Sequence, residues 1–287
     1  MPRPPRIQRR LEDSRRDGRR AVAIAALLPL LAAGCAAGHA NQASPAEEAA
    51  SGDPVTGELV VLAAASLTDV FGRLSDRFEA AHPGVRVELG LGGSSSLARQ
   101  VIDGAPADVL ATADSATMDT VVEGLRGQRI DTPALMATNA LEIAVPAGNP
   151  ADVVGLVDLT DPALAVALCA PEVPCGAAAQ RAFDAAGVSP APDTLESDVS
   201  AVLTKVRLGE VDAALVYRTD VLRAHDEVEG IPFPEAPVND YPVVVLPDAR
   251  NPAAARAFVD LVLSDEGRQV LRDAGFDVPA AMDAREP

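Results

Sequence analysis

The chain has 287 residues, of which 48% are hydrophobic and only eight are aromatic, and its formal net charge is −18. This length allows a large apolar core in one or two domains. The negative charge excludes a basic surface for nucleic acid, and it also excludes long-range attraction of anions. A bound anion would have to be held by local dipoles and hydrogen bonds.

The first 34 residues are predicted to form a lipoprotein signal peptide. Residues 1–20 carry eight arginines and three acidic residues, and an uncharged 14-residue stretch follows at 21–34. Such a stretch is too short to span a bilayer but suits the hydrophobic region of a signal. It runs into LAAGC at 31–35, which resembles the bacterial lipobox and implies cleavage before Cys35 and a lipid on its sulfur. A plain secretory signal is the alternative, and the arginine pairs 15–16 and 19–20 leave the export route open between Sec and Tat.

Residues 35–57 are predicted to be a flexible tether. They are mostly Ala, Ser, Pro, Gly and Glu, so they cannot bury enough apolar surface to fold. Without residues 1–34 the net charge becomes −23. We expect an exported protein, anchored through Cys35 to the outer face of the cell membrane.

Apolar runs and helical spacings alternate along the rest of the chain. Strands are predicted at 58–63, 85–91, 108–111, 141–145, 163–168, 213–217 and 241–246. Helices are predicted around 70–78, with Pro83-Gly84 ending the first, and at 95–103, 115–123, 176–186, 198–208, 252–263 and 265–274. This alternation predicts an α/β fold with mainly parallel sheets, in which ligands bind at the carboxyl ends of strands.

Two serine-containing segments stand where an apolar run gives way to a helical pattern. They are LAAASLTD at 62–69 and GGSSSLARQ at 92–100. A helix start offers unpaired backbone N–H groups and the positive end of a dipole, and serine adds a hydroxyl. Ser66 and Ser94 therefore predict a site for a small anion if both face one cleft. The alternative is that each serine is an ordinary helix cap.

The two cysteines beyond Cys35 are predicted to form a disulfide. Cys169 and Cys175 are an even pair in an exported chain. Two buried free thiols are one alternative. A zinc site is another, but the spacing is not Cys-x-x-Cys and the only histidines are His39, His82 and His225.

Several of these segments together resemble those of the periplasmic molybdate-binding proteins of ABC importers. The resemblance covers about residues 58–279 and rests on LAAASLTDVF at 62–71, SSSLARQ at 94–100 and GAPADV at 104–109. Further matches are AD at 113–114, VPCG at 173–176 and ALVY at 214–217. It implies the type II periplasmic-binding-protein fold, with an anion in the cleft between two lobes joined by crossing strands. We expect one lobe to comprise 58–138 and 239–287, and the other 139–238.

The resemblance also implies which residues hold the anion. Ser66 and Ser94 match the positions that give hydroxyl and amide donors from the first lobe. Cys175 and Val199 match two backbone amides, and Tyr217 matches a tyrosine hydroxyl, all from the second lobe. The family usually has a small residue where Cys175 stands. Ser197 or Asp198 could cap the helix that contains Val199.

A set of donors without a carboxylate acceptor suits a fully deprotonated tetrahedral oxyanion. Hydrogen phosphate would bury a proton without a partner, which is costly. We therefore expect molybdate or tungstate as the transported ligand, an ABC permease as partner, a monomer and no cofactor. Sulfate is the alternative ligand. A serine hydrolase is a third hypothesis, but the sequence has no G-x-S-x-G motif.

Overall fold

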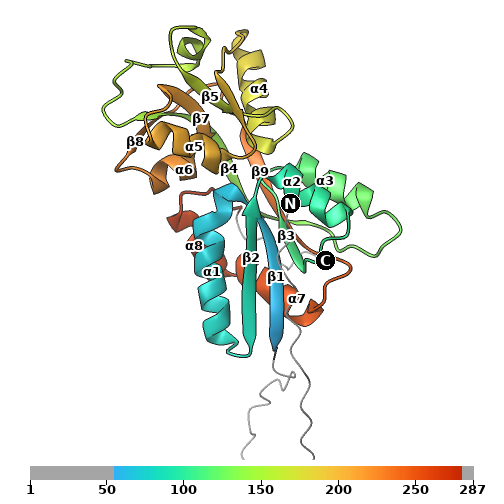
Figure 1. Cartoon of the computed structure of the whole chain (residues 1–287). Helices are drawn as coiled ribbons and strands as arrows, with labels where there is room; N and C mark the ends of the chain where they lie inside the picture. Colours follow the sequence, from blue (N-terminus) through green and yellow to red (C-terminus); the bar gives the residue numbers. More distant parts are fainter. Residues whose placement is uncertain (1–54, 280–287) are drawn as a thin grey trace, which may run out of the picture. The chain divides into compact units, whose positions relative to one another are not determined.

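Two long strands run through both halves of the fold. The computed structural model describes residues 55–279. Its strands follow the order β2-β1-β3-β9-β4-β7-β5-β6, and β8 also pairs with β4. Strand β4 (Ala134–Pro146) pairs with β9 (Val238–Val245) along its first part and with β7 and β8 along its second, so both halves share it (Figure 1).

The first lobe is built on β1 (Gly57–Ala64), β2 (Val85–Gly92), β3 (Val109–Ala111) and β9. Successive residues of a strand point to opposite faces, and in β1 Val61 and Leu62 belong to two different core clusters. The cluster with Val61 contains Phe71 and Phe78 from α1 (Thr68–Ala81) and Phe258 from α7 (Pro252–Leu263). Helix α8 (Asp265–Asp273) packs against both of these helices. The cluster with Leu62 is covered by α2 (Ser94–Ile102) and α3 (Ser115–Gly124).

The second lobe is built on β5 (Val166–Cys169), β6 (Thr194–Glu196), β7 (Ala213–Tyr217) and β8 (Val228–Ile231), together with the second part of β4. Its helices are α4 (Pro174–Ala186), α5 (Val199–Arg207) and α6 (Arg218–Arg223). All five residues of β7 are buried, which explains its continuous apolar run. The strand ends directly at α6, so Tyr217 lies at its carboxyl end.

The predicted α/β class is confirmed, but the prediction of mainly parallel sheets is wrong. Four strand pairs are parallel and four are antiparallel. The physical reason is that β4 and β9 cross from one lobe to the other and run against every neighbour they have. Sequence periodicity reports burial and not strand direction.

Most predicted elements are present within one to three residues, and the misses have two causes. Strand β4 is 13 residues long, where only 141–145 was predicted, because the sequence of its first part, ALMATNA at 134–140, has no clean alternation of apolar and polar residues. The 3₁₀ helices η1 (Ala65–Leu67) and η2 (Leu156–Thr160), β6, β8 and α6 were not predicted. Each is three to six residues long, which is too short to show a periodicity.

The predicted signal peptide, Cys35 and nearly all of the tether lie outside the described residues. Within residues 55–279 no helix is long and apolar enough to cross a membrane. The change of partner along β4 falls between Ala140, which pairs with β9, and Leu141, which pairs with β7. The lobe boundaries given above remain a prediction.

Candidate functional site

One small cavity between the lobes brings together all five residues that the sequence predicted to hold an anion. It lies where β1, β2, β5, β6 and β7 end and where the next helices begin. Its lining residues are Ala64, Ala65, Ser66, Gly92, Gly93, Ser94, Ala113, Val173, Pro174, Cys175, Asp198, Val199 and Tyr217. Residues as far apart as 66 and 217 therefore share one site.

Neither serine hydroxyl caps a helix. Ser66 lies inside the 3₁₀ helix η1, and the residue before α1 is Leu67. Ser94 is the first residue of α2, where Gly93 occupies the capping position. The Ser94 hydroxyl accepts a hydrogen bond from the Ala113 amide at 3.1 Å, and the Ser66 hydroxyl lies 3.0 Å from the Tyr241 hydroxyl. The interpretation of these serines as ordinary caps is wrong.

The second lobe presents two helix starts to the cavity. Cys175 and Val199 lie in the first turns of α4 and α5, where backbone N–H groups have no acceptor inside the helix. Pro174 stands at the first position of α4 and has no N–H to satisfy. Asp198 caps α5 by accepting from the Ala201 amide at 3.0 Å, so of the two candidate caps it is Asp198 that acts.

Cys169 and Cys175 form a disulfide, with their Cα atoms 5.7 Å apart. The bridge joins the end of β5 to the first turn of α4 and holds the loop that carries the Cys175 amide. The alternatives of free thiols and a zinc site are therefore wrong. A Cβ atom at Gly176 would clash with the Ala170 carbonyl oxygen, which shows how tightly this loop packs.

The lobes also meet at the rim of the cavity. The Ser95 hydroxyl donates to the Glu172 carbonyl oxygen at 2.6 Å. A Cβ atom at Gly93 would clash with the Ser197 carbonyl oxygen, so only glycine allows this approach of the two backbones. Contacts from both lobes therefore meet at the rim of the cavity.

Tyr217 is buried at the inner side of the cavity and stays protonated. Burial raises the pKa of Tyr217, and the charges of Asp114 and Asp220 raise it further. Its hydroxyl accepts a hydrogen bond from Nδ2 of Asn239 at 3.0 Å. Its ring packs edge-on against Tyr241, with centroids 5.8 Å apart.

Sequence reasoning missed Asn239, Tyr241 and Ala113 as parts of this site. The side chains of Asn239 and Tyr241 come from β9, which crosses between the lobes. The Ala113 peptide group lies just after the end of β3. Tyr241 stands in a predicted strand, where a buried tyrosine looks like ordinary core. Asn239 is a polar residue that is only 2% exposed next to that strand, but exposure is not visible in the sequence.

The size of the cavity limits what it can hold. Its volume is about 20 Å³. A single buried water needs about 10–15 Å³ on this scale, whereas pockets for organic ligands measure roughly 300–1,000 Å³. The cavity suits one compact ion and excludes an organic solute.

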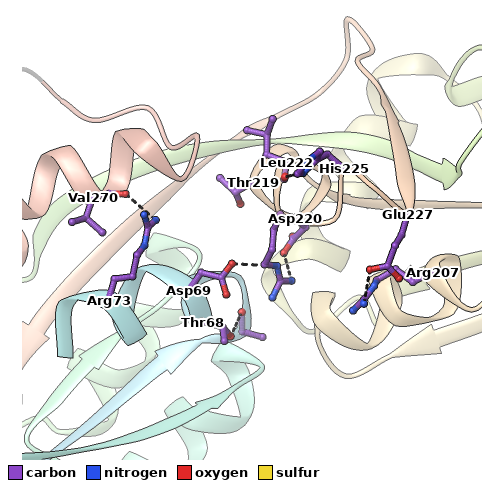
Figure 2. Close-up of polar contacts among 12 residues, drawn as sticks. Thr68, Asp69, Arg73, Arg207, Thr219, Asp220, Leu222, His225, Glu227 and Val270 are labelled. Atoms are coloured by element: carbon purple, nitrogen blue, oxygen red, sulfur yellow. Dashed lines mark hydrogen bonds and ion pairs between the residues drawn. The ribbon is translucent and has the colours of Figure 1, made fainter. Parts of the chain in front are cut away.

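A larger groove of about 580 Å³ adjoins the cavity at Ser66 and separates α1 from α6. Arg223 lines it, with Nε 4.0 Å from Oδ2 of Asp69 and Nη2 3.1 Å from Oδ1 of Asp220. Figure 2 labels both of these acidic residues. Asp220 is 1% exposed, and burial raises its pKa to about 6 against the opposing effect of Arg223. The groove is lined by Arg73 and Arg223 beside the acids Asp69, Asp76 and Asp273, so charges of both signs face it.

Comparison with known proteins decides the family. Residues 59–277 match the family described as bacterial extracellular solute-binding proteins. The chain belongs to this family. The molybdate-binding protein ModA of Mycobacterium tuberculosis is 42% identical to this solute-binding protein over 252 residues, covering 87% of this chain and 95% of the relative. ModA of Escherichia coli is 30% identical over 243 residues, covering 77% and 90%.

Solved structures show the same fold. The periplasmic molybdate-binding protein of Azotobacter vinelandii has a TM-score of 0.64 at 19% identity, covering 77% of this chain and 100% of that one. The sulfate-binding protein SubI of Mycobacterium tuberculosis has a TM-score of 0.67 at 19% identity, covering 76% and 86%. The two-lobed periplasmic-binding-protein fold is confirmed for this solute-binding protein. It is not an enzyme, and the hydrolase hypothesis is wrong.

Proposed function

We propose that this protein captures molybdate or tungstate in the cavity between its lobes and delivers it to an ABC permease. The observation that carries the proposal is that Ser66, Ser94, Cys175, Val199 and Tyr217 line one cavity of about 20 Å³. Relatives named as molybdate-binding proteins over most of the chain support the choice of ligand. No cofactor is needed, because the oxyanion is the cargo.

The chemistry of the site favours a dianion without a proton. Three hydroxyls and the first-turn amides of α4 and α5 can donate hydrogen bonds. The helix starts at Ser94, Cys175 and Val199 each carry roughly half a positive charge, with further N–H groups after Ser66. These local dipoles supply the attraction that a chain of net charge −18 cannot supply at long range. Asp198 also lines the cavity, but its two carboxylate oxygens already accept from the Ala201 amide and the Ser197 hydroxyl. Hydrogen phosphate would therefore leave its proton without a free acceptor.

Sulfate is the second candidate, because a structure of a sulfate-binding protein shares the fold. Sulfate matches molybdate in charge but is smaller, so its contacts in the same cavity would be longer and weaker. We infer that the preference runs toward the larger oxyanions.

Thermal unfolding with a panel of anions tests this proposal. A ligand that binds only the folded state stabilises it by RT ln(1 + [L]/Kd), roughly 4 kcal/mol at a thousandfold excess over Kd. Molybdate and tungstate should raise the melting temperature, sulfate should raise it less and phosphate should leave it unchanged. No shift with molybdate would overturn the proposal, and the largest shift with sulfate would favour the second candidate.

The proposal includes anchoring through a lipid on Cys35, after removal of residues 1–34 and by way of the tether at 35–57. The LAAGC segment supports it. The protein would then act as a monomer beside its permease at the outer face of the membrane. Cys35→Ala should move the protein from the membrane fraction to the soluble fraction on cell fractionation. Equal membrane retention of the variant would contradict the anchor and leave the binding proposal intact.

A further inference from the structure

A chain of hydrogen bonds runs from the surface of α4 to the anion cavity. Nη2 of Arg181 donates to Oδ1 of Asn239 at 2.6 Å. Nδ2 of Asn239 donates to the Tyr217 hydroxyl and to the Ala113 carbonyl oxygen, each at 3.0 Å. The Ala113 amide in turn donates to the Ser94 hydroxyl at 3.1 Å. Two of the three cavity hydroxyls are therefore tied to one asparagine.

The direction of these bonds is fixed by chemistry. A guanidinium group can only donate, so the amide oxygen of Asn239 must face Arg181 and the NH₂ group must face Tyr217 and Ala113. The amide cannot turn over without setting donor against donor at Arg181. Asn239 is 2% exposed, so solvent offers no substitute partner for a misplaced amide.

The consequence for Tyr217 is that its oxygen is already an acceptor. A phenol has one proton to give, and with Asn239 on its lone pair that proton points to the cavity or to the neighbouring Tyr241 hydroxyl, which already pairs with Ser66. Burial raises the pKa of Tyr217, so the proton stays on the oxygen at neutral pH. The same reasoning holds for Ser94, whose oxygen accepts from the Ala113 amide and whose proton remains free to donate. Both hydroxyls line the cavity.

We propose that Asn239, held by Arg181, is a positioning residue that turns the Tyr217 hydroxyl into a donor toward the cavity and thereby selects oxyanions that carry no proton. This inference rests on the proposed function and deepens it, because it assigns the source of the selectivity. Asn239 itself lies behind Tyr217 and does not line the cavity.

The Asn239→Asp variant reverses the direction of the bond. A carboxylate can only accept, so it takes the proton of Tyr217, and the phenol oxygen then offers a lone pair to the cavity. Molybdate loses a donor, whereas hydrogen phosphate gains an acceptor for its proton. We expect the affinity for molybdate to fall about tenfold or more and the ratio of molybdate to phosphate affinity to fall by at least about tenfold.

The measurement is competitive calorimetry at about pH 8, where hydrogen phosphate predominates, with the full chain in each variant. The added charge of Asn239→Asp repels both dianions alike and cancels in the ratio. Tyr217→Phe is the matched control, because it removes the hydroxyl on which Asn239 acts. In that background Asn239→Asp should change the ratio little, since the two residues act through one bond.

Equal loss of both affinities in Asn239→Asp, or an equal change of the ratio in the Tyr217→Phe background, would overturn the inference. If Asn239→Asp does not fold, Arg181→Met decides, because it removes one of the two groups, the Arg181 guanidinium and the Ala113 carbonyl, that hold the Asn239 amide in this orientation. It should lower the ratio in the same direction, and an unchanged ratio would overturn the inference. Failure of the wild-type protein to bind molybdate would instead overturn the proposed function.

Discussion

At the scale of single residues, Ser66 and Ser94 offer hydroxyls to the cavity that no helix cap consumes. Each is proposed to give a charge-assisted hydrogen bond to the same dianion, which contributes about 1.5–3 kcal/mol. Ser66→Ala and Ser94→Ala should therefore each weaken molybdate binding by roughly ten- to a hundredfold in calorimetry. Backbone amides remain in both variants, so binding should fall and not vanish.

Ser96→Ala is the matched control for these variants, because Ser96 lies in the same helix as Ser94 with an exposed side chain. It should bind molybdate as the wild type does. Affinities within twofold of the wild type in both single variants, with their folds intact, would contradict the assignment of the serine donors. The losses need not add in the double variant, since both donors act on one ion.

The residues of the cavity could be predicted from the sequence to the extent that they lie in local patterns. Ser66, Ser94 and Tyr217 end apolar runs or begin helices, and the family resemblance picked out Cys175 and Val199. Asn239 and Arg181 have no such pattern, because their contact joins positions 58 residues apart. Tertiary hydrogen bonds of this kind are set by the crossing of β9, which sequence periodicity does not report.

At the scale of elements, the disulfide fixes the start of α4. Removing it in Cys169→Ser frees the loop that carries the Cys175 amide, and ordering that loop again costs about 0.5–1.5 kcal/mol. Molybdate affinity should fall roughly two- to tenfold in calorimetry. The free energy of unfolding should also fall, by about 2 kcal/mol for so short a loop, in urea titration. An affinity equal to that of the wild type would contradict the role in preorganisation.

Helix α6 contains a buried acid whose ionisation opposes folding. Burial raises the pKa of Asp220 from 3.8 to about 6, although Arg223 lowers it in part. The folded state therefore holds a proton that the unfolded state releases between about pH 4 and pH 6, and stability falls as pH rises through this range. The wild type should lose up to about 3 kcal/mol of unfolding free energy relative to Asp220→Asn from about pH 4 to pH 7.

Urea titration of both proteins across that pH range measures this difference. Parallel pH profiles would show that Asp220 titrates alike in the folded and unfolded states. A wild type that gains stability relative to Asp220→Asn as pH rises would show that the ion pair with Arg223 outweighs burial.

Helices and strands whose apolar residues repeat at a clear spacing could be predicted from the sequence. Those whose place depends on tertiary contacts could not. Helix α7 has the predicted bounds 252–263, because its apolar spacing, Pro252 and the cap at Asn251 all agree. The sequence of the first part of β4 has no clean alternation, and its place in the sheet is set by its pairing with β9. Strand direction was mispredicted for the same reason.

At the scale of the whole molecule, a strongly acidic chain of net charge −18 is proposed to carry an anion. The negative surface repels an anion at long range, but salt screens these distant charges. The hydroxyls, amides and helix starts of the cavity act over a few ångströms, where they attract it. The lobes approach each other at Gly93 and Ser95, and under the proposed function an ion held there would be partly shielded from water, which would strengthen each of these bonds. The sequence predicted this arrangement of lobes through family resemblance, not through composition.

The central claim is that one oxyanion lies between Ser66 and Ser94 of the first lobe and Cys175, Val199 and Tyr217 of the second. A crystal structure of the protein grown with molybdate, with anomalous data at the molybdenum edge, tests it most directly. The account predicts one anomalous peak per chain in this cavity, with oxygens within hydrogen-bond distance of both serine hydroxyls. A peak elsewhere on the chain, or no peak at saturating molybdate, would contradict it.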